Sequence, residues 1–501
     1  MAERAAECPL RDKLESEGGN RSGRMSHERS NGSRGGPYRI GSVSKEAEEL
    51  PAGNSAVESA RDGRHAPPLN SSPGAESPPV GVPIDSSSTP VVISPGPATM
   101  ERQKEVNKRK AHSLIDKVYG RKNLWTAWRR VRANKGAHGL DRVTIHAFEA
   151  DVRTHLEEIQ RKLMEHRYEP QPVRRVYIPK SSDPKQRRPL GIPVVADRIV
   201  GQALLQILDP LFDPEMSDRS FGFRKGRKAH QAISTVIQDG KDGFRFVLDA
   251  DIASFFDRID HQVVMSRVRA RIADGRVLDL IEAFLKAGVC EAGVVSVPTE
   301  GTPQGGVISP WLSNLVLDDL DKAIEAKGWR HVRYADDFVV LCTTHQEAQE
   351  ALAYIKEVLA ALKLSLHETK TRLTDFWAGF EFLGFRFRCH RLGIRPKSIE
   401  RFKDKLRTLT RRLQGRNVEA VIAEVSPVVR GWAQYFGCAE VGSLFRTLDR
   451  WIRMRVRSFR FKRRCREDNH RLPNRRLSKW GLLSLQECRP VLRLSYMAAE
   501  T

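Results

Sequence analysis

Three aspartates in this sequence stand at positions where acidic side chains could hold metal ions. Asp251 ends the apolar segment "FVLDAD", and the adjacent Asp336 and Asp337 lie between the apolar segments "HVRY" and "FVVLC". Hard cations such as Mg²⁺ take oxygen ligands and keep open positions for phosphate groups. Two such ions about 4 Å apart can activate a hydroxyl group and neutralise a leaving pyrophosphate. Carboxylates that converge from separate strands therefore indicate phosphoryl transfer as the candidate chemistry.

The acidic pair also has a simpler interpretation, because aspartate is common in hairpin turns, where its side chain bonds to the nearby backbone. A second acidic strand end favours the metal site instead. Asp251 lies 85 residues before Asp336, so the carboxylates would come from different strands. Asp249 is the alternative ligand on the first strand, since side chains two residues apart share one face of a strand. Asp249 lies before the end of the strand, so Asp251, at the strand end, is the preferred ligand.

The segments that must position these aspartates have the pattern of a mixed α/β fold. Apolar residues alternate up to the first acidic strand end, at Phe244, Phe246, Leu248 and Ala250. Further upstream the sequence predicts a strand over 173–178, a basic, proline-containing turn over 180–189 and a helix from Asp197. The loop "EGTPQGG" at 300–306 precedes another helix, which the spacing of three apolar residues indicates: Ile308, Leu312 and Leu315.

After residue 395 the pattern changes to helices alone. Apolar residues three and four positions apart form three stripes: Ile399, Phe402, Leu406, Leu409 and Leu413; Val418, Val421 and Val425, ending near Pro427; and Leu444, Leu448 and Trp451. Basic residues occupy the rest of the first helix surface, and residues 451–480 hold 12 basic and 2 acidic residues. The sequence therefore predicts a small, basic helical bundle.

Charge and composition restrict the class of protein. The chain has a formal net charge of +23, and residues 1–100 hold 11 basic and 13 acidic residues, so the remainder carries +25. A folded region that basic is typical of proteins that bind nucleic acid. Residues 1–100 also hold 12 of the 27 prolines, which predicts a disordered leader, with a translation start at Met100 as an alternative. The seven cysteines form no C-x-x-C pair, and no apolar stretch predicts a membrane span.

Seven segments, in a fixed order, resemble the reverse transcriptases encoded by bacterial group II introns. They are "RRPLGIPVVADRIVGQAL" (187–204), "SFGFRKGRKAHQAI" (220–233), "DIASFFDRIDH" (251–261), "GTPQGGVISPWLSNLVLDDLD" (301–321), "YADD" (334–337), "LSLHETKTRL" (364–373) and "FEFLGFRF" (380–387). In addition, "VSPVVRGWAQYF" (425–436) resembles the maturase, or X, segment of that family.

The resemblance implies the right-hand polymerase fold, an α/β fingers and palm followed by an all-α thumb and maturase bundle. Its parts would be the disordered leader (1–100), the fingers and palm (101–395), the thumb and maturase X domain (396–465) and a short basic nucleic-acid-binding tail (466–501). Cys465, His470 and Cys488 lack the spacing of the zinc-supported H-N-H endonuclease found in many relatives, so we expect no such domain.

The resemblance also implies roles for individual residues. Asp251, Asp336 and Asp337 would be the catalytic residues and would bind two Mg²⁺ ions, for which Mn²⁺ could substitute. The residues implied in nucleotide binding are Lys180, Arg188, Phe256, Gln304 and Lys370. Phe256 would block a 2′-hydroxyl group and so favour deoxynucleotides, with ordinary core packing as the alternative.

Two further sets of residues are implied in contacts with nucleic acid. The bundle and tail would bind RNA through four basic residues: Arg430, Arg453, Arg457 and Lys462. The segment "FLGF" (382–385) resembles the primer grip, although its aromatic residues could equally be core. The aromatic residues of the maturase-like segment are expected in the core of the bundle: Trp432, Tyr435 and Phe436.

Together these features predict an RNA-directed DNA polymerase that also binds its group II intron RNA as a maturase and supports intron mobility by target-primed reverse transcription. Its partners would be the intron RNA, an RNA template with a DNA primer, deoxynucleotides and target DNA, and no membrane. It would act in the bacterial cytoplasm and at the nucleoid, and its oligomeric state is left open. The alternatives are a splicing-only maturase and a domesticated defence or retron-type reverse transcriptase.

Overall fold

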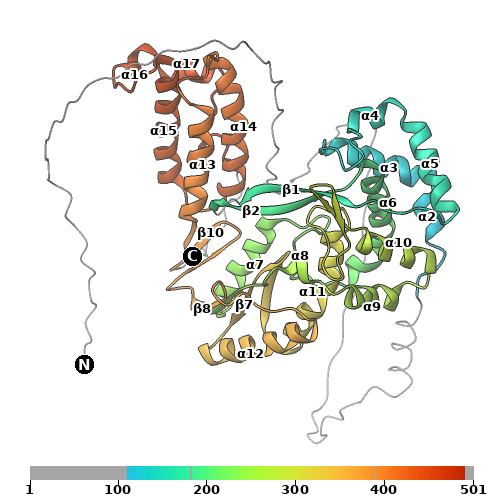
Figure 1. Ribbon diagram of the computed structural model, residues 1–501. Coiled ribbons are helices and arrows are strands. Elements are labelled where there is room, and N and C mark those ends of the chain that lie inside the picture. Colours follow the sequence, from blue (N-terminus) through green and yellow to red (C-terminus); the bar gives the residue numbers. More distant parts are fainter. Residues whose placement is uncertain (1–109, 181–182, 390, 491–501) are drawn as a thin grey trace, which may run out of the picture. The chain divides into compact units, whose positions relative to one another are not determined.

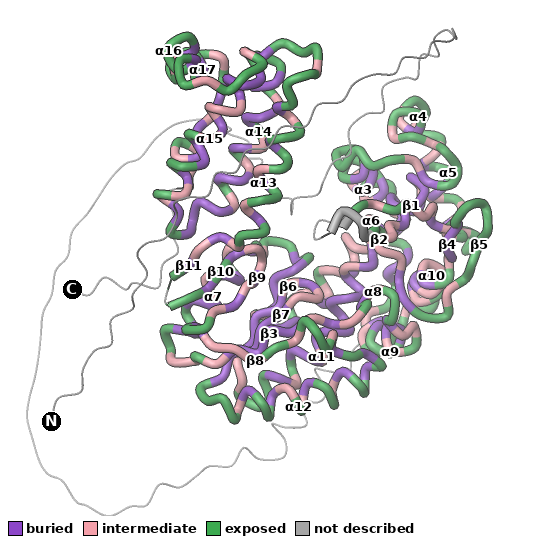
Figure 2. The backbone as a smooth tube through the Cα atoms, turned by 60° about the vertical axis from the view of Figure 1, so that its left-hand side comes forward, coloured by how far each residue is buried: buried purple, intermediate pink, exposed green. Residues whose placement is uncertain are grey.

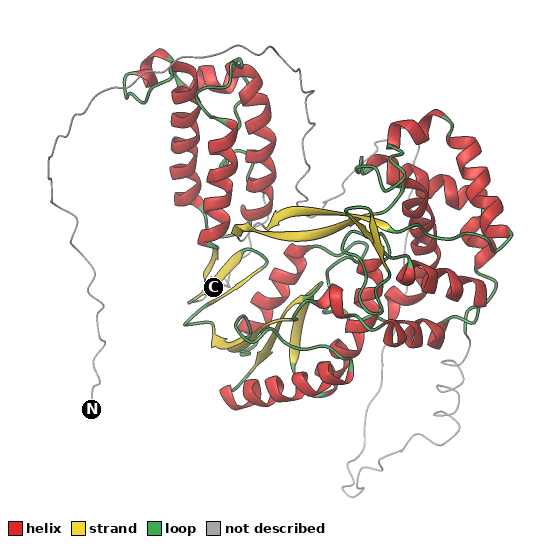
Figure 3. Cartoon of the chain, viewed as in Figure 1, coloured by secondary structure: helices red, strands yellow, loops and turns green. Residues whose placement is uncertain are grey.

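The computed structural model describes residues 110–180, 183–389 and 391–490, without the side chains of 180–186. The expected leader at 1–100 and the possible start at Met100 lie outside these residues. Within them, a mixed α/β region precedes an all-helical region, which confirms the expected fold class (Figure 1; Figure 3). No helix in the described ranges is both long and apolar enough to cross a membrane.

A four-stranded antiparallel sheet, called the central sheet below, carries the predicted acidic strand ends. Its spatial order is β6 (Arg330–Tyr334), β7 (Asp337–Cys342), β3 (Phe246–Asp251) and β8 (Arg372–Asp375). The strand expected before Asp251 is therefore confirmed, beginning at Phe246. Figure 2 shows that β3, β6 and β7 run through buried surroundings, because both faces of the sheet are covered.

Alternation along the strands sends side chains into two different cores. Leu248, Ala250 and Phe338 join one core, together with α11 (Ser309–Ala326) and α12 (His345–Ala361). Val247, Val339 and Leu341 join the other core, together with α7 (Ala229–Lys241). The face toward the second core is the one that also carries Asp249, Asp251 and Asp337, because the register of β3 and β7 pairs Asp251 with Asp337 and Asp249 with Val339.

A second sheet has the order β2 (Asp183–Ile192), β1 (Val173–Lys180), β4 (Val289–Glu291) and β5 (Val294–Ser296). The strand expected over 173–178 is confirmed, but the turn expected over 180–189 is wrong. Residues 183–192 form the strand β2, which pairs with β1 from Arg174↔Ile192 to Pro179↔Arg187. The prolines that suggested a turn are tolerated because β2 is an edge strand, where a missing N–H costs no ladder hydrogen bond.

The described helices before residue 300 other than α7 contribute side chains to the first core, except for one 3₁₀ turn among them. They are α2 (Ile115–Tyr119), α3 (Arg121–Ala133), α4 (Ile145–Ala150), α5 (Val152–Met164), α6 (Val195–Phe212), the 3₁₀ turn η1 (Asp213–Glu215), α8 (Phe255–Arg258), α9 (His261–Arg271) and α10 (Gly275–Lys286). The helix expected from Asp197 begins two residues earlier, at Val195. The helix expected after the 300–306 loop is α11.

A small sheet connects the central sheet to the helical bundle. Its order is β11 (Arg391–Ile394), β10 (Phe385–Arg388) and β9 (Phe380–Phe382). The helices that follow are α13 (Pro396–Leu409), α14 (Val418–Phe436), α15 (Gly442–Phe461), α16 (Asp468–Arg471) and α17 (Asn474–Lys479). All of these elements contribute apolar side chains to the second core except α16, so this core continues from the central sheet into the bundle.

The bundle differs from expectation at three points. The first stripe ends with α13 at Leu409, and Leu413 is 93% exposed. Pro427 lies inside α14 rather than at its end, because the buried Val425 and Val429 on either side keep the helix in the core. Part of the expected separate tail packs with the bundle, since four leucines beyond residue 465 are buried in the second core: Leu472, Leu477, Leu482 and Leu485.

Candidate active site

The register of β3 and β7 brings two of the predicted carboxylates together. Asp251, the last residue of β3, lies directly opposite Asp337, the first residue of β7. Side chains directly opposite in an antiparallel pair have Cβ atoms about 4.5–5.5 Å apart. Asp336 occupies the turn between β6 and β7, beside both. The sheet thus gathers acidic residues from two distant segments at the ends of neighbouring strands.

The electrostatics of this acidic cluster are dominated by burial and by the mutual repulsion of its carboxylates. Burial raises the pKa of Asp337 to about 8, and the carboxylates of Asp249, Asp336 and Asp251 contribute to the rise. Burial also raises the pKa of Asp336, and the charge of Asp251 raises it further. A cation placed among these groups would favour their charged forms. Because the donors are hard carboxylate oxygens, the set fits a divalent ion such as Mg²⁺.

Asp249 lies on the same face, two residues before Asp251, and is 9% exposed. Burial raises its pKa to about 6, while Arg372 of β8, which forms an ion pair at 3.4 Å, acts in the opposite direction. Sequence reasoning considered Asp249 but missed Arg372. The sequence feature that points to Arg372 is its position two residues after "HETK" (367–370), at the start of the strand β8, which pairs Arg372 with Asp249.

Lys370 contacts the cluster directly. Its Nζ lies 2.7 Å from Oδ2 of Asp251. The backbone keeps the preceding residues beside β3, because Leu366 pairs with Ile252 and the His367 N–H donates to the Asp251 carbonyl at 2.7 Å. Across residues 110–180, 183–389 and 391–490, no group of three or more histidine, cysteine or acidic side chains is arranged so that it could hold a metal ion. In this arrangement the Lys370 ammonium group is the charge that lies next to Asp251.

Phe256 and Gln304 lie in two segments that pack against each other. Phe255 is 2% exposed, whereas Phe256 is only partly buried beside it, with ring centroids 5.3 Å apart. The Phe256 carbonyl accepts a hydrogen bond from the Thr302 N–H at 2.7 Å, which ties α8 to the 300–306 loop. The structure thus distinguishes the buried Phe255 from the more accessible Phe256.

The same loop approaches the strand β2. The Gly191 N–H donates to the Gln304 carbonyl at 2.6 Å. Gly305 has φ +107°, and a Cβ atom there would lie 2.4 Å from the Gly191 carbonyl oxygen. Only glycine permits both this backbone conformation and this approach. The loop that holds Gln304 is therefore tied to the strand that holds Arg188.

Arg188 and Lys180 lie on the β1–β2 hairpin. Arg188 is exposed, pairs in register with Ile178, and its charge lowers the pKa of Asp336 against the effect of burial. The guanidinium group thus lies within electrostatic range of the acidic cluster. The Lys180 backbone ends β1, and its side chain lies outside the described residues.

Comparison with known proteins agrees with this geometry. Residues 178–387 match the family model described as reverse transcriptase (RNA-dependent DNA polymerase), and residues 399–479 match the group II intron, maturase-specific domain. The chain is 35% identical over 304 residues to protein YkfC of Escherichia coli (strain K12), a match that covers 52% of this chain and 79% of YkfC. The chain belongs to the reverse transcriptase family. It also carries a group II intron maturase domain.

Two further relatives of this reverse transcriptase have names that mention introns. The group II intron-encoded protein LtrA of Lactococcus lactis subsp. cremoris is 29% identical over 391 residues, covering 63% of each chain. Nuclear intron maturase 1, mitochondrial, of Arabidopsis thaliana is 38% identical over 94 residues, covering 19% of this chain and 13% of that one. The reverse transcriptase thus spans less than two thirds of LtrA and a small part of the plant maturase.

The four predicted RNA-binding residues of the maturase domain differ from one another in how far they are exposed. Arg430 on α14 is exposed, Arg453 on α15 is half-buried, and Lys462 follows α15 in a left-handed conformation with φ +58°. Lys462 is exposed, yet its ammonium group donates to the Arg412 carbonyl and lies 4.6 Å from the Phe459 ring centroid.

Arg457 lies inside the bundle instead. It is 8% exposed, and its guanidinium group donates to the Leu472 carbonyl at 2.9 Å and to Asn474 Oδ1 at 2.7 Å. Burial lowers the pKa of Arg457, and the nearby charge of Arg453 lowers it further. These contacts hold the segment after α15 against the bundle, so Arg457 is not part of the RNA surface proposed below. Its sequence signal was misleading because charge density alone does not distinguish a buried arginine from an exposed one.

The aromatic residues of the predicted primer grip belong to the core. Phe382 and Phe385 are 1% and 0% exposed, whereas the Leu383–Gly384 turn between them has positive φ at both residues. Tyr435 of α14 donates to the Leu383 carbonyl at 3.0 Å, and its neighbours Trp432 and Phe436 are each 7% exposed. The expected core position of Trp432 and Phe436 is confirmed. The partly buried Leu383–Gly384 turn, rather than the rings, is the more accessible part of this motif.

Proposed function

We propose that this reverse transcriptase copies RNA into DNA at the acidic cluster of the central sheet. The observation that carries the proposal is the pairing of Asp251 with Asp337, next to Asp336, in surroundings that raise carboxylate pKa values. Two Mg²⁺ ions, or Mn²⁺ in their place, would be held by these three residues and would supply charge stabilisation for phosphoryl transfer. Asp249 and Arg372 would support them from the same face.

The chain's other residues would bind and orient the nucleotide. Arg188 is exposed and within electrostatic range of Asp336, which suits a contact with the negatively charged triphosphate. The half-accessible ring of Phe256 lies in the segment next to Asp251, where it could exclude a 2′-hydroxyl group. Lys370 would keep Asp251 oriented until the substrate arrives, and its ammonium group would then be free to donate a proton to pyrophosphate.

The first experiment is extension of a DNA primer on an RNA template by the purified full-length protein with Mg²⁺. Asp337→Asn should lower kcat by about 10²–10³-fold, since it removes a ligand of the ions that would stabilise the charge on the reacting phosphate. Asp257→Asn is the matched control, because Asp257 is an exposed aspartate on the short helix next to the site. Extension by Asp337→Asn at the rate of Asp257→Asn would overturn the proposal.

The maturase domain supports a second activity, the binding of group II intron RNA to assist splicing. The bundle is strongly basic: residues 451–480 hold 12 basic and 2 acidic residues, and the exposed Arg430 lies on the neighbouring helix. Contacts of this kind to phosphates add affinity that falls as salt rises. Arg430→Ala should weaken binding of the intron RNA that flanks the gene several-fold, whereas Arg457→Lys, at a buried position, should change stability more than the salt dependence of binding.

The two activities can be separated in one set of assays. Asp337→Asn should abolish primer extension and leave stimulation of intron splicing within about twofold, because Asp337 belongs to the reverse transcriptase region (178–387) and not to the maturase-specific region (399–479). A wild-type protein that stimulates splicing but extends no primer would support the splicing-only alternative. Target-primed reverse transcription, with target DNA as partner, is the mobility step that the combination of activities would allow. It would be detected as new intron DNA joined to a target 3′ end.

A further inference from the structure

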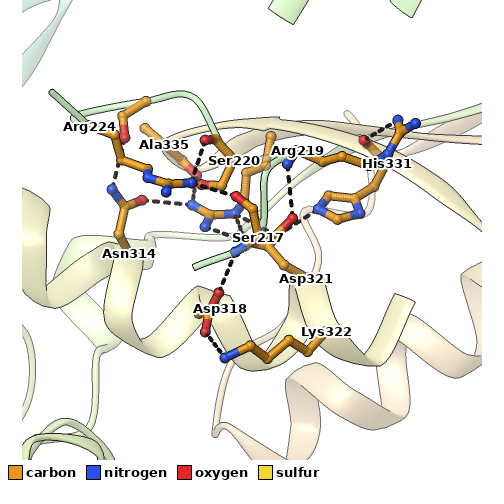
Figure 4. Close-up of polar contacts among 12 residues, drawn as sticks. Ser217, Arg219, Ser220, Arg224, Asn314, Asp318, Asp321, Lys322, His331 and Ala335 are labelled. Carbon is orange, nitrogen blue, oxygen red and sulfur yellow. Dashed lines mark hydrogen bonds and ion pairs between the residues drawn. The ribbon is translucent and has the colours of Figure 1, made fainter. Parts of the chain in front are cut away.

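A fully buried arginine stands two residues before the acidic turn. Arg333 is the fourth residue of β6 and is 0% exposed. Its Nε lies 2.8 Å and its Nη2 2.5 Å from the two carboxylate oxygens of Asp321, which lies on α11 and is also 0% exposed. Burial alone would raise the pKa of Asp321, but Arg333 and His331 together lower it, so the pair is ionic. Figure 4 shows Asp321 and His331 within this buried network.

The same guanidinium group reaches the backbone of the acidic turn. Arg333 Nη1 donates to the Ala335 carbonyl at 3.1 Å and to Asn314 Oδ1 at 2.8 Å. Asn314, on α11 and 2% exposed, donates in turn to the Gly222 carbonyl at 2.8 Å. Figure 4 shows Asn314 and Ala335 in the same part of this hydrogen-bond network. A side chain that is already held by Asp321 thus fixes one peptide of the turn.

The backbone at Ala335 needs such support. Ala335 has φ +61°, a left-handed conformation that residues other than glycine seldom adopt. Conformations of this kind persist when the surrounding structure holds them. The neighbouring segment packs tightly here, because a Cβ atom on Gly222 would lie 2.2 Å from the Ala335 N atom. This segment also extends the sheet beside β6, where the Phe221 N–H donates to the Arg333 carbonyl at 2.9 Å.

We propose that Arg333, oriented by Asp321, is a positioning residue for the polymerase reaction: its hydrogen bond to the Ala335 carbonyl holds the left-handed turn that presents Asp336 and Asp337 to metal and nucleotide. This inference rests on the polymerase function proposed above. A buried ion pair adds little net stability compared with an apolar pair of similar volume, so stability alone gives little reason for placing these charges here. Catalytic groups, by contrast, must be held within about 0.5 Å of their productive positions.

Asp239 provides a matched control in the same part of the structure. It is 1% exposed and accepts hydrogen bonds from Arg219 at 2.7 Å and from Arg330 at 2.8 Å, so it too is a buried aspartate paired with arginine. Arg330 is the first residue of β6, at the end away from the acidic turn, whereas Arg219 lies beside β6 and its carbonyl accepts a hydrogen bond from the Arg333 N–H at 3.0 Å. Neither arginine contacts Ala335 through its interaction with Asp239. Asp239→Asn therefore reproduces the loss of a buried charge without removing the support of Ala335.

The experiment compares Asp321→Asn, Arg333→Lys and Asp239→Asn in the full-length protein. Circular dichroism first sets a temperature at which each variant is folded, and single-nucleotide incorporation on an RNA template is then measured. Asp321→Asn and Arg333→Lys should lower kcat at least tenfold with the deoxynucleotide KM within threefold, and should raise the half-saturating Mg²⁺ concentration. Asp239→Asn should keep kcat and the Mg²⁺ requirement within twofold of wild type. Equal kcat in the Asp321 and Asp239 variants would overturn the positioning role.

A second substitution tests the role of the turn itself. Glycine adopts φ +61° without steric cost, so Ala335→Gly should restore kcat at least threefold when added to Arg333→Lys. Arg333→Lys keeps a positive charge beside Asp321, so it decides the matter if Asp321→Asn fails to fold. Unchanged kcat on adding Ala335→Gly would refute the mechanism. If the wild-type protein extends primers and all three variants match it, only the positioning role fails; if the wild type extends none, the polymerase function fails and takes this inference with it.

Discussion

Binding of a divalent ion at the acidic cluster is expected to depend steeply on pH, because a protonated carboxyl group cannot act as a ligand. Burial and the neighbouring carboxylates raise the pKa of Asp337 to about 8. Below pH 8 most of the metal-free protein is therefore protonated at this residue, and the ion must displace the proton. For a pKa of about 8, the apparent affinity for the ion should be about 50-fold weaker at pH 6 than at pH 8.

Mn²⁺ is the appropriate probe, because electron paramagnetic resonance measures the concentration of free Mn²⁺ directly. Titrations of the protein without nucleic acid at pH 6, 7 and 8 give the apparent dissociation constants. Asp257→Asn should show the same pH dependence as wild type, whereas Asp337→Asn should bind more weakly and lose most of that dependence. An affinity in the wild type that changes less than threefold between pH 6 and pH 8 would refute the inference that Asp337 is a ligand with a raised pKa.

Three further predictions concern the stability of the metal-free site, the choice of nucleotide and the packing of the helical bundle. The pKa of Asp337 is raised in the folded state, so the protonated carboxyl group stabilises the metal-free protein fully below about pH 4. This stabilisation is lost as the pH rises through about 8. At pH 8.5, metal-free Asp337→Asn should therefore melt at a higher temperature than the metal-free wild type. Phe256→Ala should raise the efficiency of ribonucleotide relative to deoxynucleotide incorporation at least about tenfold, measured by single-turnover extension, and Phe255→Ala, at a 2% exposed position, should instead reduce stability. Asp449 accepts hydrogen bonds from Ser484 Oγ at 2.7 Å and the Leu485 N–H at 2.8 Å, so Asp449→Asn should lower the free energy of unfolding by about 1–3 kcal/mol in urea, while the exposed Asp404→Asn should change it little.

The strands and long helices could be predicted from the sequence because one local pattern dominates in each. The alternation before Asp251 and the spacing after the 300–306 loop reflect burial of one face, and β3 and α11 follow them. Prediction failed where tertiary context decides. The prolines of 183–192 lie in an edge strand, and the helix α14 continues through Pro427 because its flanks are buried. Neither outcome depends on the local segment alone.

That Asp251, Asp336 and Asp337 would lie together could be predicted for a related reason, because each stands at or next to the end of an apolar strand. Arg457 could not be assigned correctly, because a basic segment contains both exposed and buried arginines and only packing separates them. Arg333 is a sharper case. In "HVRYADD" it alternates with apolar neighbours as a solvent-facing residue of a half-buried strand would, yet α11 covers that face and supplies Asp321.

Several departures from ordinary sequence rules meet at the turn that holds Asp336. An alanine has positive φ, carboxylates have raised pKa values, and an arginine and an aspartate are completely buried. Such conflicts between local preference and global structure are expected mainly at functional sites, where neighbouring contacts compensate for them. Here the compensation is specific, because the hydrogen bond from Arg333 reaches the strained alanine itself. If the conflict were incidental to packing, Ala335→Gly would relieve it without affecting catalysis in any background; a gain in kcat confined to the Arg333→Lys background would show that the strain and the network act on one turn.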